Sequence, residues 1–164
     1  MQIFIADIDS ISKNTDDYLS WLTPEHQARA KKFQKRTRKL QFILGHLIVD
    51  KIGKKYSSIA HKDKLVVVAT ASNTPVGVDI ENVSIKRDFV NAAVIAGIKT
   101  PKTLYDFYKL FTEAEAAYKL GEKPVCTHFI DYGYYLICIT ANHKFTLPHL
   151  EFLDIRSFLP AKKK

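Results

Sequence analysis

Two pairs of charged residues have the types and the spacing to carry out chemistry. Asp79 and Glu81 lie one residue apart in the apolar run VGVDIE (76–81). Alternate side chains of a strand share a face, so both carboxylates are expected to point the same way, where their charges repel unless a cation, a raised pKa or solvent intervenes. Glu115 and Lys119 lie four residues apart in FTEAEAAYK (111–119), on one face of an expected helix.

Each pair also has a purely structural explanation. The first is compatible with a strand running into a polar loop, and the second with a solvated pair on a helix surface. Taken together, the three carboxylates form a candidate site for Mg²⁺ or Mn²⁺, because these cations prefer oxygen ligands. Lys119, one helical turn beyond Glu115, is then placed to meet phosphate groups that accompany such a cation.

The elements that position these residues are expected to alternate between strands and helices. Strands are predicted at 1–8, 56–71 (two strands joined at 61–63), 76–81, 132–141 and 151–155, and helices at 23–33 continuing with a possible break through 39–52, at 87–98 and at 103–121. This order predicts an α+β fold of two related halves, 1–72 and 73–164. The C-terminal half carries the carboxylates, and its last few residues are expected to be a disordered tail.

The composition limits the classes of function. The 164 residues are 46% hydrophobic, which is enough for a core, and the net charge of +8 favours an anionic partner: nucleic acid, a phosphorylated small molecule or an acidic protein. Many basic residues lie in 29–39, which is expected to be one helix with an apolar side. No stretch is expected to span a membrane or to act as a secretory signal, and Cys126 and Cys138 are expected to be reduced core thiols, so a cytoplasmic protein is predicted.

The two charged segments resemble those of the 4′-phosphopantetheinyl transferase superfamily. The motifs of that family are (V/I)-G-(V/I)-D-x-E, which 76–81 matches, and W-(S/T)-x-K-E-A-x-x-K, which 111–119 resembles with Phe111 in place of the tryptophan. The segments 18–33, 38–52 and 58–71 resemble the N-terminal helices and strand pair of its larger, two-half type. The resemblance therefore runs from about residue 3 to residue 155 and implies two similar α+β halves with pseudo-twofold symmetry and coenzyme A between them.

The resemblance implies a reaction and a partner. Such enzymes transfer the 4′-phosphopantetheine arm of coenzyme A to a serine of an apo acyl or peptidyl carrier protein, with Mg²⁺, and release adenosine 3′,5′-bisphosphate. The acidic carrier protein suits a basic surface, and a chain with both halves is expected to act as a monomer without binding nucleic acid or membranes.

The resemblance also implies roles for individual residues. Asp79, Glu81 and Glu115 would hold the metal, Glu115 would also take the proton of the serine, and Lys119 would neutralise charge on the transferred phosphate. The residues expected to bind coenzyme A are basic: His61, Lys54 and Lys62, with Lys32, Arg36 and Arg38 as candidates for its 3′-phosphate.

Two alternatives stay open. Ala60 and Lys62 replace the serines that flank the family's histidine, and Ala114 replaces the lysine before its glutamate. These differences suit a non-catalytic relative that binds coenzyme A or a carrier protein. A nucleic-acid-binding protein that uses 29–39 is the third hypothesis, although no known nucleic-acid motif supports it.

Overall fold

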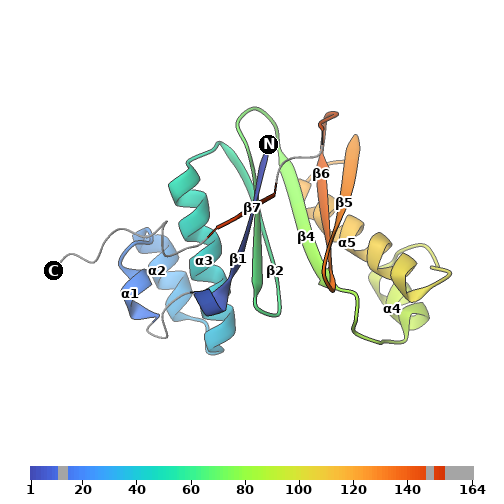
Figure 1. Cartoon of the computed structure of the whole chain (residues 1–164), viewed down its shortest axis with the longest axis horizontal. Coiled ribbons are helices and arrows are strands. Elements are labelled where there is room, and N and C mark those ends of the chain that lie inside the picture. The colour runs from blue at the N-terminus through green and yellow to red at the C-terminus, as the bar shows by residue number, and fades with distance from the viewer. Residues whose placement is uncertain (11–14, 147–149, 154–164) are drawn as a thin grey trace.

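The computed structural model describes residues 1–10, 15–146 and 150–153 (Figure 1). The predicted disordered tail lies outside the described residues. The first half contains β1 (Gln2–Asp7), a short 3-10 helix η1 (Ile8–Ser10), α1 (Asp16–Leu19), α2 (Pro24–Lys31), α3 (Arg36–Ile52), β2 (Tyr56–Lys62) and β3 (Leu65–Ala71). The second half contains β4 (Val76–Asn82), α4 (Phe89–Ala96), α5 (Leu104–Leu120), β5 (Cys126–Tyr132) and β6 (Tyr135–Ala141), and β7 (Leu150–Phe152) follows.

The strands form two sheets in which the same order occurs twice. The first sheet has the order β2-β3-β1-β7 and the second the order β4-β6-β5. In each half the first strand pairs antiparallel with the third, and the second strand also pairs antiparallel with the third. β7 extends the first sheet by pairing parallel to β1. The predicted α+β class is therefore confirmed, and the strand order repeats between 1–72 and the part that follows.

The layers run from helices through two sheets to helices. Figure 1 shows α1 to α3 on one side, the two sheets in the middle, and α4 and α5 on the other side. The inner faces of the sheets share one core, which includes Ile5 on β1, Val67 on β3, and Val78 and Ile80 on β4. The two sheets are thereby fixed against one another, so residues at the ends of their strands hold defined relative positions.

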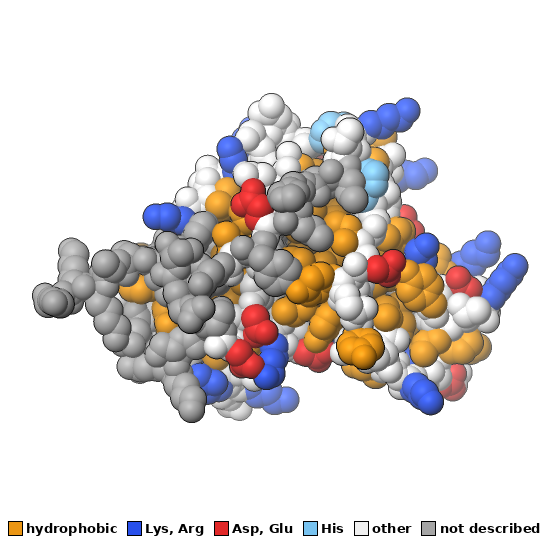
Figure 2. Space-filling model, in the orientation of Figure 1, with side chains coloured by type: hydrophobic (Ala, Val, Ile, Leu, Met, Phe, Trp, Pro, Cys, Tyr) orange, Lys and Arg blue, Asp and Glu red, His pale blue; other side chains and the backbone are white. Residues whose placement is uncertain are grey.

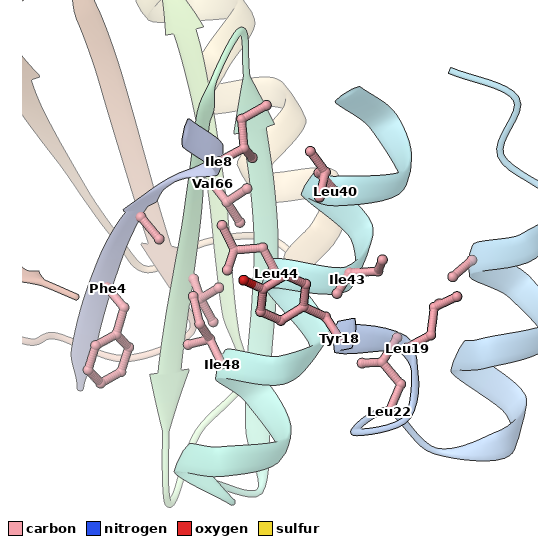
Figure 3. Packing of buried hydrophobic residues seen from close by; sticks show 13 residues of the cluster. Phe4, Ile8, Tyr18, Leu19, Leu22, Leu40, Ile43, Leu44, Ile48 and Val66 are labelled. Atoms are coloured by element: carbon pink, nitrogen blue, oxygen red, sulfur yellow. The ribbon is translucent and has the colours of Figure 1, made fainter. Parts of the chain in front are cut away.

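A second core joins α3 to the outer face of the first sheet. Leu40, Leu44 and Ile48 on α3 pack against Phe4 and other buried strand residues (Figure 3). The spacing of these three residues gives the helix a single apolar side, as a helical period requires. Packing of this side turns the N-terminal end of α3, where Arg38 lies, towards the end of the β2–β3 hairpin.

The ends of the helices follow local sequence signals. Thr23 Oγ1 accepts a hydrogen bond from His26 N at 3.3 Å, and Pro24 opens α2, as predicted. Gly53 and Gly121 end α3 and α5 with φ of 62° and 81°, a conformation that suits glycine. The C-terminal ends of the helices predicted at 39–52 and 103–121 are thereby confirmed to within one residue.

One expectation about the elements was wrong, and one strand was missed. The basic segment 29–39 is not one helix, because α2 ends at Lys31 and α3 begins at Arg36. Strand β5, within 126–132, was not expected, because its half-buried residues alternate only weakly in hydrophobicity. It was missed although it forms a hairpin with β6 and completes the second sheet.

Candidate functional site

The glycine before the acidic pair lets α5 approach β4 closely. A Cβ atom built on Gly77 would lie 2.0 Å from the backbone oxygen of Ala116 and 2.7 Å from Thr140 Oγ1. Any larger residue would therefore have to push the helix away from the strand. Since alternate residues share a face, Asp79 and Glu81 also lie on the side of β4 that α5 covers. The predicted common face of the two carboxylates thus lies against the helix of the second motif.

Lys119 on α5 reaches the first carboxylate directly. Its Nζ donates hydrogen bonds to Asp79 Oδ1 at 2.7 Å and to Val78 O at 3.1 Å. Asp79 is only 8% exposed, and its Oδ2 atom is buried without a hydrogen-bond partner. A buried carboxylate oxygen without a partner is costly, so a cation at this position would stabilise it.

The surroundings of Asp79 act against its ionisation. The pKa of Asp79 is raised from an ordinary value of 3.8 to about 6, mainly by burial, with Lys119 acting to lower it and the negative charges of Glu81 and Glu115 acting to raise it. The influence of Glu115 on Asp79 places this half-buried residue of α5 within electrostatic reach of the strand. Glu115 is therefore close enough to influence Asp79 electrostatically.

Glu81 has a basic neighbour from the other half. Lys62 Nζ, at the end of β2, lies 2.6 Å from Glu81 Oε2, and both side chains are largely buried. The pair lacks hydrogen-bond geometry, and Glu81 Oε2 is buried without a hydrogen-bond partner. Strands β2 and β4 thus meet at this end, and Lys62 and Lys119 each hold one carboxylate.

The carboxylates of Asp79, Glu81 and Glu115 are suitable ligands for a hard cation. Their oxygens do not yet converge on a common position. Among the residues that the structure describes, no three His, Cys, Asp or Glu side chains form a group that could hold a metal ion as they stand. The donors are all carboxylate oxygens, as Mg²⁺ and Mn²⁺ prefer, and Asp79 Oδ2 has no other partner. Binding of a cation would therefore require the two lysines to shift.

A basic cavity lies on the first half. It has a volume of about 170 Å³ and is lined mainly by α3 and β2. Arg38 Nη1 contacts both ring nitrogens of His61, at 2.8 Å from Nδ1, and donates to Gln41 Oε1 at 3.2 Å. The remaining lining residues are Arg29, Phe33, Phe42, His46 and Ile59. Two guanidinium groups beside aromatic rings suit an anion that carries a flat ring system.

The imidazole of His61 in this cavity is held neutral. Burial and the positive charge of Arg38 lower the pKa of His61 to about 4, and the charges of Lys119 and Lys62 act in the same direction. A neutral ring can accept a hydrogen bond from Arg38. The effect of Lys119 also shows that His61, in the first half, lies within electrostatic reach of the carboxylate site in the second half.

A chain of hydrogen bonds links the two regions. Gln41 Nε2 on α3 donates to the backbone oxygen of Asp63, in the β2–β3 turn, at 2.8 Å. Asp63 Oδ2 accepts from Asn82 Nδ2 at the end of β4 at 2.8 Å and from Tyr135 OH on β6 at 3.1 Å. The turn that follows His61 and Lys62 is therefore held between both halves.

The other predicted binding residues lie apart from this cavity. Lys32 and Arg36 are exposed around the break between α2 and α3, and neither lines the cavity. Lys54 lines a separate hollow near Met1, at the end of β2 opposite to His61. The structure thus brings Arg38, His61 and Lys62 together and leaves the other three elsewhere.

Most of the residues that line the cavity were not predicted, and Arg29 and Gln41 are two polar examples. Arg29 precedes the predicted Lys32 by about one helical turn. Arg29 lies on the side of α2 that faces α3, and its guanidinium is 5.2 Å from the centre of the Phe42 ring. Gln41 is 4% exposed in the middle of an apolar helix face. A buried amide among apolar residues is the sequence signal that points to it, because such a group needs partners.

Gly45 shows how α3 comes close to β2. A Cβ atom on this residue would lie 2.7 Å from Cγ2 of Ile59, two residues before His61. The close packing of helix and strand at this point fixes the wall of the basic cavity, much as Gly77 fixes the approach of α5 to β4.

Of the predicted core thiols, Cys138 is fully buried on β6, where burial raises its pKa. Cys126 is half-buried at the start of β5, and its Sγ lies 3.4 Å from His128 Nε2. Both cysteines are free in the structure.

Comparison with known proteins gives no family for the chain. No protein-family model matches it, and no curated protein matches it. Among the described residues, no helix combines the length and the apolar character needed to cross a membrane.

Proposed function

We propose that the protein transfers the 4′-phosphopantetheine arm of coenzyme A to a serine of an apo carrier protein. The contact between Lys119 and Asp79 is the observation that carries this proposal. It joins the two segments that resemble the transferase motifs, and it leaves the second oxygen of Asp79 buried without a partner. The Gly77 contact with Ala116 explains why the first segment needs its glycine.

The two regions suit two adjacent parts of coenzyme A, its adenosine 3′-phosphate and its pyrophosphate. Arg29, Arg38 and His61 provide positive charge and hydrogen-bonding groups beside the Phe42 ring, which fits an adenine nucleotide with a 3′-phosphate. Lys62 and Lys119, beside the carboxylates, fit its pyrophosphate. The turn at Asp63 keeps these regions in register.

The residues of the chain have distinct roles in the proposed reaction. Asp79, Glu81 and Glu115 would hold a Mg²⁺ ion, which when bound neutralises charge on the pyrophosphate. Glu115 takes the proton of the carrier serine hydroxyl, whose oxygen forms a bond to the phosphorus next to the pantetheine. The bond from that phosphorus to the bridging oxygen breaks, and adenosine 3′,5′-bisphosphate leaves with the electron pair. Lys119 stabilises the negative charge that develops on the phosphate oxygens.

The proposed partner is a small acidic carrier protein. Figure 2 shows lysine and arginine side chains interspersed with hydrophobic ones on the right-hand part of the visible face, where α4 and α5 lie. Lys99 and Lys102 are exposed between these helices, and Val94 and Ile95 are 72% and 87% exposed on α4. A surface of this kind steers an acidic protein and offers it apolar contacts.

The test is transfer of a labelled arm. The protein is incubated with coenzyme A that carries a fluorophore on its thiol, Mg²⁺ and an apo carrier protein, and the carrier is then separated on a denaturing gel. Fluorescence on the carrier that disappears with EDTA is expected. No fluorescence on any carrier tested would contradict the proposal.

A non-catalytic relative is the second candidate. The ion pairs of Lys62 with Glu81 and of Lys119 with Asp79 favour it, because both carboxylates are already neutralised without a metal. This candidate predicts that coenzyme A binds, as measured by calorimetry, but that no arm is transferred.

A further inference from the structure

Lys62 forms an ion pair with Glu81, one of the three carboxylates of the proposed metal site. Its ammonium group lies 2.6 Å from Glu81 Oε2, with side chains that are 24% and 12% exposed. Charges that are this close and largely withdrawn from water interact strongly. A divalent cation would therefore have to compete with the ammonium group of Lys62 for the Glu81 carboxylate.

Lys62 also has an anion-binding region beside it. Lys62 follows His61 on β2, so the two side chains point to opposite faces of the strand, but the charge of Lys62 still contributes to the lowered pKa of His61. The guanidinium of Arg38 contacts the same histidine. A phosphate group bound at this end of β2 would therefore give the ammonium of Lys62 another negative partner within reach of its flexible stem.

We propose that Lys62 couples the binding of the anionic substrate to the binding of the divalent cation. Without substrate, Lys62 neutralises Glu81 and weakens the uptake of the cation. When a phosphate binds near His61, Lys62 pairs with it and leaves Glu81 for the cation. Lys62 is thus a positioning residue that makes the two ligands bind cooperatively. This inference rests on the proposed function, since it assumes that Asp79 and Glu81 take a cation.

The coupling is measured by titration of the protein with Mn²⁺, with free Mn²⁺ followed by electron paramagnetic resonance, in the absence and presence of coenzyme A. Lys62→Met is expected to bind Mn²⁺ about tenfold more tightly than the wild type without coenzyme A. Its gain in Mn²⁺ affinity on addition of coenzyme A is expected to be about tenfold smaller than that of the wild type. Since coupling is reciprocal, the effect of Mn²⁺ on coenzyme A affinity must change by the same factor.

Lys64→Met is the matched control. Lys64 lies two residues further along the hairpin and pairs with Asp9 on the surface instead of with Glu81. It is expected to behave like the wild type in both titrations. Lys62→Gln serves as a second variant, and thermal unfolding followed by circular dichroism shows whether each variant is folded.

The outcomes separate this inference from the proposed function. If folded Lys62→Met and Lys62→Gln bind Mn²⁺ as the wild type does, with the same response to coenzyme A, the inference is wrong while the metal site stands. If the wild type and both variants bind no Mn²⁺ under either condition, the proposed metal site fails and the inference falls with it.

Discussion

Lys119 Nζ lies 2.7 Å from Asp79 Oδ1, and this hydrogen bond joins helix α5 to strand β4 across 40 positions of the chain. The contact is possible because Gly77 allows the helix backbone to approach the strand. It places Glu115, one helical turn earlier, within electrostatic reach of Asp79. The acidic residues of β4 and the charged residues of α5 thus lie together as the candidate site.

Replacement of Asp79 by asparagine is expected to change how stability depends on pH. The folded-state pKa of Asp79, about 6, lies above its ordinary value of 3.8, so the folded state binds the proton more tightly. The stabilisation from the proton is therefore complete below about pH 4 and is lost as the pH rises through 6. Relative to the wild type, Asp79→Asn should gain on the order of 2 kcal/mol in the free energy of unfolding between pH 4 and pH 7.

Urea denaturation of both proteins at several pH values, in buffer with EDTA, measures this difference. A difference in the free energy of unfolding that stays constant across the range would show that the Asp79 carboxyl titrates alike in the folded and unfolded states.

Replacement of Glu115 by glutamine is expected to abolish transfer of the arm without lowering thermal stability. Glu115 is half-buried within electrostatic reach of Asp79, and a glutamine amide in its place neither takes a proton nor adds charge for a cation. Glu113→Gln is the matched control, because Glu113 lines a different hollow with Leu110 and Phe129. Rates of arm transfer should separate the two variants, and equal rates would remove Glu115 from the site.

Replacement of Gly77 by alanine is expected to lower the free energy of unfolding by roughly 3 kcal/mol and to abolish transfer. The added methyl group would meet the backbone oxygen of Ala116 and force α5 away from β4. Gly45→Ala is a useful comparison, since its methyl group would meet the flexible end of Ile59 and alanine favours the helix by about 1 kcal/mol. The free energy of unfolding of Gly45→Ala should fall by less than about 1 kcal/mol. Equal losses for both variants in denaturant unfolding would argue against the close approach at Gly77.

Replacement of Phe111 by alanine is expected to cost less stability than replacement of a fully buried phenylalanine. Phe111 is half-buried and stacks on Phe107 with ring centres 5.6 Å apart. Phe107 is 1% exposed. The expected losses are roughly 1–2 kcal/mol for Phe111→Ala and about 3–5 kcal/mol for Phe107→Ala. Chemical denaturation of both variants gives the comparison, and a larger loss for Phe111→Ala would place that ring in the core.

Much of the fold could be predicted from local signals. The cap at Thr23 and the helix ends at Gly53 and Gly121 depend on short-range geometry, which the sequence carries directly. Strand β5 could not be predicted in this way, because it is an edge strand with half-buried residues and gains its stability from pairing with β6. A possible break between 33 and 39 was predicted, but its position after Lys31 was not, since a basic segment looks alike in one helix or two.

The site was predictable in its acidic part and less so in its basic part. Asp79 and Glu81 were selected because residues two apart in a strand share a face. Glu115 was selected because it lies four residues before Lys119 on one face of a helix. Which basic residues line the cavity depends on how α2 and α3 pack together, so Arg29 was missed while the exposed Lys32 was selected. The pairing of Lys62 with Glu81 depends on how the two halves meet, which no local pattern encodes.

The mass of apo carrier proteins after incubation with the protein, coenzyme A and Mg²⁺ tests the central proposal most directly. We expect one carrier to gain the mass of a single phosphopantetheine arm, and we expect no gain with EDTA, with Asp79→Asn, or with a carrier whose acceptor serine is replaced by alanine. If no carrier in a panel of fatty-acid, polyketide and peptide types gains this mass, although the protein binds coenzyme A, the proposed transfer is contradicted and the non-catalytic relative is favoured.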